Sequence, residues 1–162
     1  MRQAIELNLA VLDEGRAVLA QLREAARDET IARVGPHFRH CIDFYDCFLA
    51  GLPSGRVDYD ARARAARIEA SPRTAASELE RIHQALQALT SADLDRDLDI
   101  VADTMPAHAP TRSTVRRELA FLLSHTIHHY ALIAMLLRQD GVKAPAEFGF
   151  APSTLAHAAH ED

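Results

Sequence analysis

Residues 122–133 read LLSHTIHHYALI, and they place three histidines inside a strongly apolar stretch of the sequence. His125 and His129 are four residues apart, so on a helix they lie one turn apart on the same face. Leu122 and Ile133 share this face, which indicates that it points inward. Buried imidazoles need partners, because an unpaired buried polar group costs roughly 1–3 kcal/mol. The spacing leaves two alternatives open, a metal ion bound by both imidazoles or a metal-free hydrogen-bond network.

Apolar residues repeat at helical spacing in four long segments of the chain. The expected helices cover residues 2–26, residues from Gly35-Pro36 to about Gly51, residues 72–90, and a segment that Thr111, Ser113 or Thr114 caps and that ends by Asp140-Gly141. Asp28-Glu29-Thr30 breaks the pattern and predicts a connector before the second helix. The whole chain, 1–162, is expected to form one domain, an all-α four-helix bundle.

The segments between these helices carry weaker signals. Residues 57–70 are expected to begin extended and to become a short helix, after which Ser71 caps the third long helix. Residues 91–112 are predicted to form a loop, with a short strand near 98–102. Residues 142–162 are expected to form an irregular arm, because they contain Pro145, Gly149 and Pro152. The long links after the second and third helices indicate that the bundle is not a plain up-down-up-down one.

Charge and composition exclude several classes of partner. The net charge is -5 and no basic tract is present, so binding to duplex nucleic acid is not expected. The N-terminus lacks the apolar core of a signal peptide, and no apolar run approaches the ~18–20 residues of a transmembrane helix. Cys41 and Cys47 are six residues apart and lie on different faces of a helix, which predicts free thiols rather than a mutual disulfide. A cytoplasmic location fits these features.

The second long helix supplies a further candidate metal ligand. His40 lies close to the direction of Phe44 and Cys47, which indicates that it faces inward. A histidine of this helix, together with His125 and His129, would supply three nitrogen ligands from facing helices. Three protein ligands leave a position for water or substrate, which is the arrangement of catalytic rather than structural zinc sites. His37 is about 60° away by helical rotation, and we expect it to be a surface or supporting residue.

Two motifs give the chain a resemblance to a known family. The segment GPHFRHCIDFY, residues 35–45, resembles the His-x-x-Asp helix of the DinB/YfiT-like superfamily of metalloenzymes. The segment SHTIHH, residues 124–129, resembles its His-x-x-x-His helix, and the separation of about 85 residues also fits. The resemblance covers nearly the whole chain, and FGFAPST, residues 148–154, is similar to the tail of one bacterial branch.

The resemblance implies a bundle in up-down-down-up order and a divalent metal held by His40, His125 and His129. Characterised relatives include transferases and isomerases that use low-molecular-weight thiols such as bacillithiol or mycothiol, with the metal activating the thiol. Imidazole ligands suit several ions, and we expect zinc or nickel. The expected activity is that of a metal-dependent transferase or hydrolase acting on a small molecule. The alternatives are a non-catalytic, stress-associated metal-binding bundle and a metal-free bundle. A homodimer formed through an apolar helix face is a further expectation.

Two carboxylates are candidate catalytic or supporting residues. Asp43 follows His40 by three residues and could accept a hydrogen bond from a ligand imidazole, or form a surface ion pair. Glu118 lies two turns before His125 on the same face and could be a general base, or pair with an arginine of another helix. The arginine-rich run 62–67 is either a solvated face or a group of cations that holds an anionic substrate.

Overall fold

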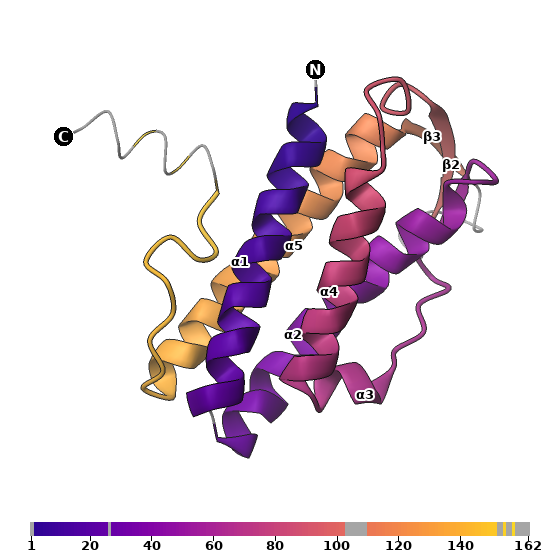
Figure 1. Ribbon diagram of the computed structural model, residues 1–162. Coiled ribbons are helices and arrows are strands. Elements are labelled where there is room, and N and C mark those ends of the chain that lie inside the picture. Colours follow the sequence, from indigo (N-terminus) through magenta and orange to yellow (C-terminus); the bar gives the residue numbers. More distant parts are fainter. Residues whose placement is uncertain (1, 26, 103–109, 152–153, 155–156, 158–162) are drawn as a thin grey trace.

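The fold is mostly helical in the computed structural model, which describes residues 2–25, 27–102, 110–151, 154 and 157. The helices are α1 (Gln3–Ala25), α2 (Asp28–Gly51), α3 (Ala66–Glu69), α4 (Pro72–Gln87) and α5 (Val115–Gln139) (Figure 1). α1 packs mainly against α4, and α2 mainly against α5, while α1–α5 and α2–α4 contacts complete the arrangement. In Figure 1, α1 descends from the N-terminus, α2 and α4 rise from the lower end, and α5 descends again.

A small sheet lies at one end of these helices (Figure 1). β1 (Arg56–Asp58) pairs in parallel with β2 (Asp97–Val101), and β2 pairs antiparallel with β3 (Thr111–Thr114). The strand expected near 98–102 and the extended start of 57–70 are therefore confirmed. The third strand was not predicted, because its four polar residues show no alternation of apolar and polar side chains. The sheet is a local addition to the expected all-α architecture.

The beginning of α2 corrects a prediction. The helix begins at Asp28 instead of Gly35-Pro36, so the expected connector over Asp28-Glu29-Thr30 is wrong. Acidic residues in the first turn interact favourably with the helix dipole, which explains why this segment supports a helical start. Pro36 then lies inside the helix, where it gives up one backbone hydrogen bond. The preceding residue is glycine, which removes the Cβ that would crowd the proline ring.

The other helix ends follow the local chemistry expected from the sequence. Ser71 caps α4 by accepting a hydrogen bond from the Thr74 amide at 3.2 Å, with Pro72 in the first turn. Thr114 caps α5 in the same way. Gly141, with φ +73°, follows α5 in the left-handed region, and the next amide, that of Val142, returns to the Leu137 carbonyl at 2.8 Å. This is a Schellman end, and it confirms the predicted boundary.

The core is apolar and contains one buried polar link between three helices. Tyr45 of α2 donates to the Asn8 side chain of α1 at 2.6 Å, and Asn8 donates to the Leu119 carbonyl of α5 at 3.0 Å. The largest fully buried side chains of the core are Tyr45, Tyr130, Phe38, Phe48, Ile5, Leu12, Leu19, Leu22, Ile42, Leu79, Ile82 and Leu86. Because buried polar groups are costly unless paired, this link fixes how the three helices meet.

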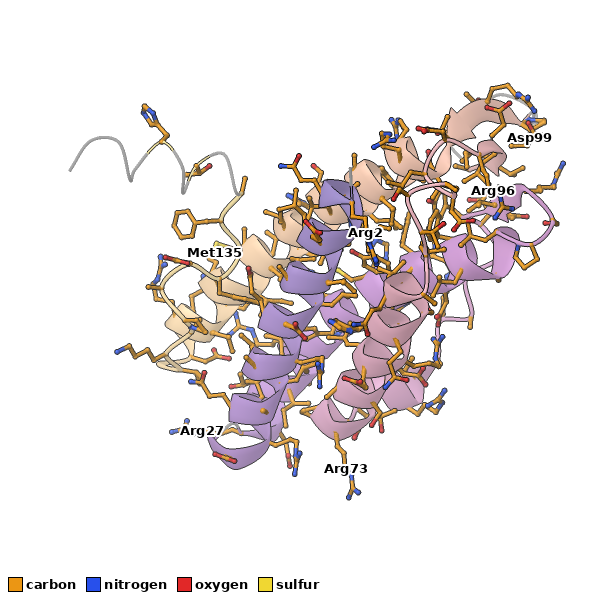
Figure 2. The ribbon with its side chains drawn as sticks, turned by 45° about the horizontal axis from the view of Figure 1, so that its top comes forward. Arg2, Arg27, Arg73, Arg96, Asp99 and Met135 are labelled. Atoms are coloured by element: carbon orange, nitrogen blue, oxygen red, sulfur yellow. The ribbon has the colours of Figure 1, made fainter. Side chains whose placement is uncertain are left out.

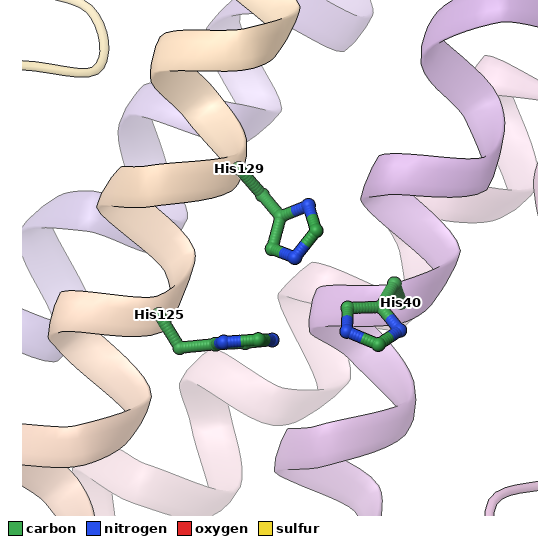
Figure 3. Close-up of side chains that lie close together, drawn as sticks. All are labelled: His40, His125 and His129. Atoms are coloured by element: carbon green, nitrogen blue, oxygen red, sulfur yellow. The ribbon is translucent and has the colours of Figure 1, made fainter.

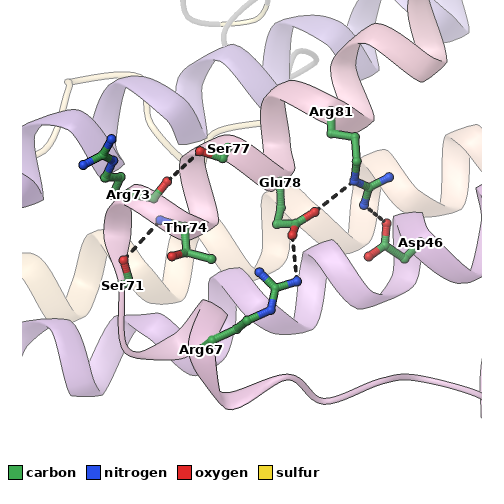
Figure 4. A network of polar contacts seen from close by, with 8 residues as sticks. All are labelled: Asp46, Arg67, Ser71, Arg73, Thr74, Ser77, Glu78 and Arg81. Carbon is green, nitrogen blue, oxygen red and sulfur yellow. Dashed lines mark hydrogen bonds and ion pairs between the residues drawn. The ribbon is translucent and has the colours of Figure 1, made fainter.

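Charged side chains occupy the outer surface. In Figure 2, Arg27 and Arg73 project away from the helices, whereas Arg2 donates a hydrogen bond to the Gln87 carbonyl at the end of α4 at 3.1 Å. Figure 4 shows a polar network in which Glu78 of α4 accepts hydrogen bonds from Arg67 and Arg81, at 3.0 and 2.9 Å. Arg81 also pairs with Asp46 of α2. Exposed ion pairs of this kind each contribute little, but the network ties α4 to its neighbours.

The described part of the C-terminal arm, residues 142–151, packs against α5. Phe148 is buried and stacks on Tyr130, with ring centroids 4.7 Å apart. Gly149 has φ +82° and lies against the α5 backbone, where an added Cβ would come within 2.5 Å of the Ala131 nitrogen. The irregular arm is thus confirmed over these residues. The predictions for 152–153, 155–156 and 158–162 lie outside the described residues.

α5 is long and apolar enough, by length and composition, to cross a membrane, with a mean hydropathy of 1.4 over its most apolar window. This differs from the expectation that the chain holds no such segment. Core helices of soluble proteins pass the same test, and α5 packs along one face against α1 and α2. Only 28% of that window is buried, so the opposite face is largely uncovered, with Met135 46% exposed.

Candidate metal site

Three histidines meet between α2 and α5. His40 comes from α2, while His125 and His129 come from successive turns of α5 (Figure 3). The ring centroids are 5.0 Å apart for His40 and His125, 4.6 Å for His40 and His129, and 4.7 Å for His125 and His129. One ring nitrogen from each lies within 4.8 Å of the other two. A tetrahedral ion with ligands at 2.0–2.1 Å needs nitrogens about 3.3 Å apart, so small side-chain rotations would close the triangle.

The electrostatics of the triad favour the neutral imidazoles that bind metals. Burial, together with a smaller contribution from the neighbouring histidines, lowers the pKa of His40, His125 and His129 to about 4. At neutral pH each ring therefore carries a free lone pair. The Nε2 atom of His125 is buried and has no hydrogen-bond partner among the described residues. An orphaned nitrogen that faces two other imidazoles fits a metal ligand, so the donor set suits a divalent ion such as zinc.

His37 holds one of the three rings in place. Its Nδ1 lies 2.9 Å from Nδ1 of His129, so one ring donates a hydrogen bond to the other. This contact leaves Nε2 of His129 for an ion, and Figure 3 shows one nitrogen of that ring pointing toward His40 and His125. Burial lowers the pKa of His37, which favours its neutral form. His37 is thus a supporting residue, one of the two roles expected for it. His128 is exposed and only its ring edge meets His129.

Aromatic side chains line the triad on the side toward the sheet. The Phe44 ring lies 4.8 Å from His40 and 4.5 Å from His125, and Phe121 stacks on His125 at 5.6 Å. Tyr59 stacks on Phe44 at 5.1 Å. Such a wall excludes water on one side and strengthens electrostatic interactions at the triad. This aromatic wall was not predicted from the sequence. Phe44 and Phe121 each lie one helical turn from a triad histidine, and this spacing indicates that their rings contact the triad.

Glu118 lies on the far side of this wall. The carboxylate is buried, and its two oxygens accept hydrogen bonds from Tyr59 at 2.8 Å and from Ser113 at 2.6 Å. Arg117 approaches it at 3.5 Å from the next position of the same helix. These four polar residues border a cavity of about 230 Å³ that Phe121 also lines. Glu118 thus connects the sheet to α5 at the border of this cavity.

Asp43 is buried and forms an ion pair along its own helix. It accepts a hydrogen bond from Arg39 at 2.8 Å, and Arg39 also pairs with Glu69. The contact that fixes a triad imidazole therefore comes from His37, whereas Asp43 forms an ion pair, although a buried one rather than the surface pair that was its alternative. Asp43 also borders a second cavity of about 290 Å³ beside Cys47.

The chain's own thiols are poorly suited to nucleophilic chemistry. Cys41 and Cys47 are both free and buried, as expected. Burial raises the pKa of the Cys41 thiol to about 12 and that of Cys47 to about 11. Because the thiolate is the reactive form, both thiols are inert at neutral pH.

Comparison with known proteins adds the family. The chain is 33% identical over 113 residues to FK506-binding protein 5 of Rhizopus delemar, a match that covers 65% of this chain and 29% of that protein. The chain therefore corresponds to less than a third of this relative. No solved structure matches the chain. The sequence pattern of the DinB superfamily matches residues 30–133, a span that includes all three histidines of the triad and most of α2 and α5. This match covers more than half of the chain and agrees with the helical structure, so the protein belongs to the DinB superfamily.

Proposed function

We propose that this protein is a metal-dependent enzyme that holds one divalent ion, zinc or nickel, through His40, His125 and His129. The observation that carries the proposal is the convergence of three neutral imidazoles with a buried, unpartnered Nε2 on His125. With three protein ligands, a bound ion would offer an open position and lower the pKa of a thiol or water placed there. The family match supports the same assignment.

The residues around the triad have defined roles in this proposal. His37 fixes the ring orientation of His129 through the 2.9 Å contact. Phe44 and Phe121 keep water from one side of the triad. Glu118, at the cavity beyond Phe121, is the candidate for accepting a proton from a molecule bound there.

The proposed reaction is transfer of a low-molecular-weight thiol to a small-molecule substrate. The two cysteines of the chain are buried and have raised pKa values, so a reactive thiol would have to come from outside the protein. Hydrolysis, with water in place of the thiol, uses the same open position. The chain directions in Figure 1 support an up-down-down-up bundle of the DinB/YfiT type as the scaffold for either reaction.

The alternative is a non-catalytic protein in which the ion is structural. One observation favours it: the triad joins α2 to α5, so a bound ion would cross-link two of the long helices. In that case metal removal would lower stability strongly, and the fourth coordination position would be closed by another group of the chain.

Elemental analysis of the purified, untagged protein tests the proposal, with the His40→Ala/His129→Ala double variant as control. We expect about one equivalent of zinc or nickel in the wild type and none in the variant. Absence of metal in the wild type, even after reconstitution, would overturn the proposal. Replacement of His129 alone by alanine separates the two roles. Loss of activity with a retained fold supports the enzyme, and loss of folding supports the structural ion.

A further inference from the structure

One arginine beside the triad differs from the other arginines with partly buried side chains. Among the described residues, Arg16, Arg39 and Arg62 are the arginines that are half-buried rather than exposed. Arg16 and Arg39 each form ion pairs with two carboxylates. Arg62 has no carboxylate partner within the described part of the chain, and its recorded side-chain contact is with an aromatic ring. A positive charge is thus held partly out of water without an opposite charge beside it among the described residues.

The position of Arg62 places this charge at the triad. Its guanidinium carbon lies 5.0 Å from the centre of the Phe44 ring. The same ring contacts His40 at 4.8 Å and His125 at 4.5 Å. The guanidinium also contributes to the lowered pKa of both histidines, after burial and neighbouring imidazoles. Arg62 therefore lies within electrostatic reach of the place where a substrate would meet the ion.

The chain as a whole carries a net charge of -5, so Arg62 and the arginine-rich run 62–67 are a local positive feature of an acidic protein. A partly desolvated guanidinium is unfavourable unless it is paired, and stacking on Phe44 compensates for this only in part. A carboxylate matches the fork of a single guanidinium with two parallel hydrogen bonds. A phosphate group is usually bound by several donors together, whereas Arg62 is the one half-buried arginine of the described residues that has no carboxylate partner there.

We propose that Arg62 binds the carboxylate of a small organic acid whose other end reaches the triad. This inference rests on the proposed metal-dependent function, and it names the substrate class of that site: small molecules that carry a metal-binding group, such as a thiol, and a carboxylate. Arg62 gives this site its preference for anions, and Phe44 holds the guanidinium in position.

Two thiols that differ only at one end test the inference on cobalt-loaded protein. The probes are 3-mercaptopropionate, which carries a carboxylate, and 2-mercaptoethanol, which carries a hydroxyl. Binding is followed through the sulfur-to-cobalt absorbance, with cobalt content measured in each sample. The variants are Arg62→Met, which keeps an apolar chain over Phe44, Arg62→Lys, which keeps the charge, and Arg73→Met. The last removes the same charge from an exposed site on α4 (Figure 2).

We expect Arg62→Met to reduce the preference for 3-mercaptopropionate over 2-mercaptoethanol by at least about tenfold. Arg62→Lys should retain part of the preference, and Arg73→Met should retain all of it. Equal preference in wild type and Arg62→Met would overturn the inference while leaving the metal site intact. Failure of the wild type to bind cobalt would overturn the proposed function and this inference with it, and the measured cobalt content distinguishes the two failures.

Discussion

The contact between His37 and His129 makes a quantitative prediction about metal affinity. Replacing His37 by phenylalanine keeps a ring of similar shape but removes the nitrogen that lies 2.9 Å from Nδ1 of His129. When Nε2 of His129 binds a cation, Nδ1–H becomes a stronger donor, and a hydrogen bond to a charged group contributes about 1.5–3 kcal/mol. Since 1.4 kcal/mol is a factor of ten, we expect zinc affinity to fall about 10–100-fold.

Competition with a chromophoric chelator measures the zinc dissociation constant of each variant. His128→Ala is the matched control, because His128 precedes His129 directly but is exposed. Its removal should change the affinity less than about twofold, since it makes only an edge contact with the ring. His37→Asn should restore part of the lost affinity, because an asparagine oxygen can accept the hydrogen bond in place of the imidazole nitrogen.

Two results would refute the reasoning. If His37→Phe bound zinc as tightly as the wild type, the contact would have no role in orienting His129. If His37→Phe lost zinc completely, as His129→Ala is expected to do, then His37 would be a ligand in its own right. The stoichiometry at saturation distinguishes a weakened site from an abolished one.

Three further predictions concern stability. The Tyr130 hydroxyl is buried and has no hydrogen-bond partner among the described residues, so Tyr130→Phe should raise the free energy of unfolding by about 1 kcal/mol. If urea denaturation gave a lower free energy of unfolding for the variant, the hydroxyl would be hydrogen-bonded after all. A Cβ at position 15 would lie 2.0 Å from that hydroxyl, so Gly15→Ala should lower the melting temperature, by the equivalent of about 1–3 kcal/mol. In metal-free protein the pKa of His40, His125 and His129 is about 4 when folded, against about 6.5 when unfolded. Unfolding therefore takes up protons between these values, and stability should fall as the pH drops through this window but not above it. Solvent screening reduces the total loss to about 3 kcal/mol, and a flat urea profile from pH 7.5 to 4.5 would contradict the expectation.

The sequence predicted those features that depend on a few neighbouring residues. The four-residue spacing of His125 and His129 placed both on one face of a helix, and the direction of His40 placed it opposite them. Ser71 and Gly141 marked helix ends, and Thr114 was one of three candidate caps, because capping depends on hydrogen bonds between neighbouring residues. In each case the feature depends on the geometry of a single helix, which a few neighbouring residues determine.

Features that depend on contacts between distant segments were predicted poorly. The hydrogen bond between Tyr59 and Glu118 joins residues far apart in sequence, and no local sequence pattern predicts it. β3, which contains Ser113, is a strand because its backbone pairs with the edge of β2. Its own polar residues show no alternating pattern that predicts a strand. Pro36 suggests the beginning of a helix, because the fixed φ of proline suits the first helical turn. The same φ also suits an interior position where the loss of one backbone hydrogen bond is tolerated, and Pro36 lies at such a position in α2.

The structure also bears on the two alternatives that the histidine spacing left open. A metal-free network would have to satisfy the buried nitrogens of the triad with hydrogen bonds. His129 has such a bond, to His37, but the buried Nε2 of His125 has none among the described residues. Its ring neighbours are the phenyl rings of Phe44 and Phe121, which offer no N–H or O–H donor, and the imidazoles of His40 and His129, neither of which forms a hydrogen bond to it. A divalent ion shared with His40 and His129 would satisfy that nitrogen and would explain why a helix as apolar as α5 carries polar rings on its inward face.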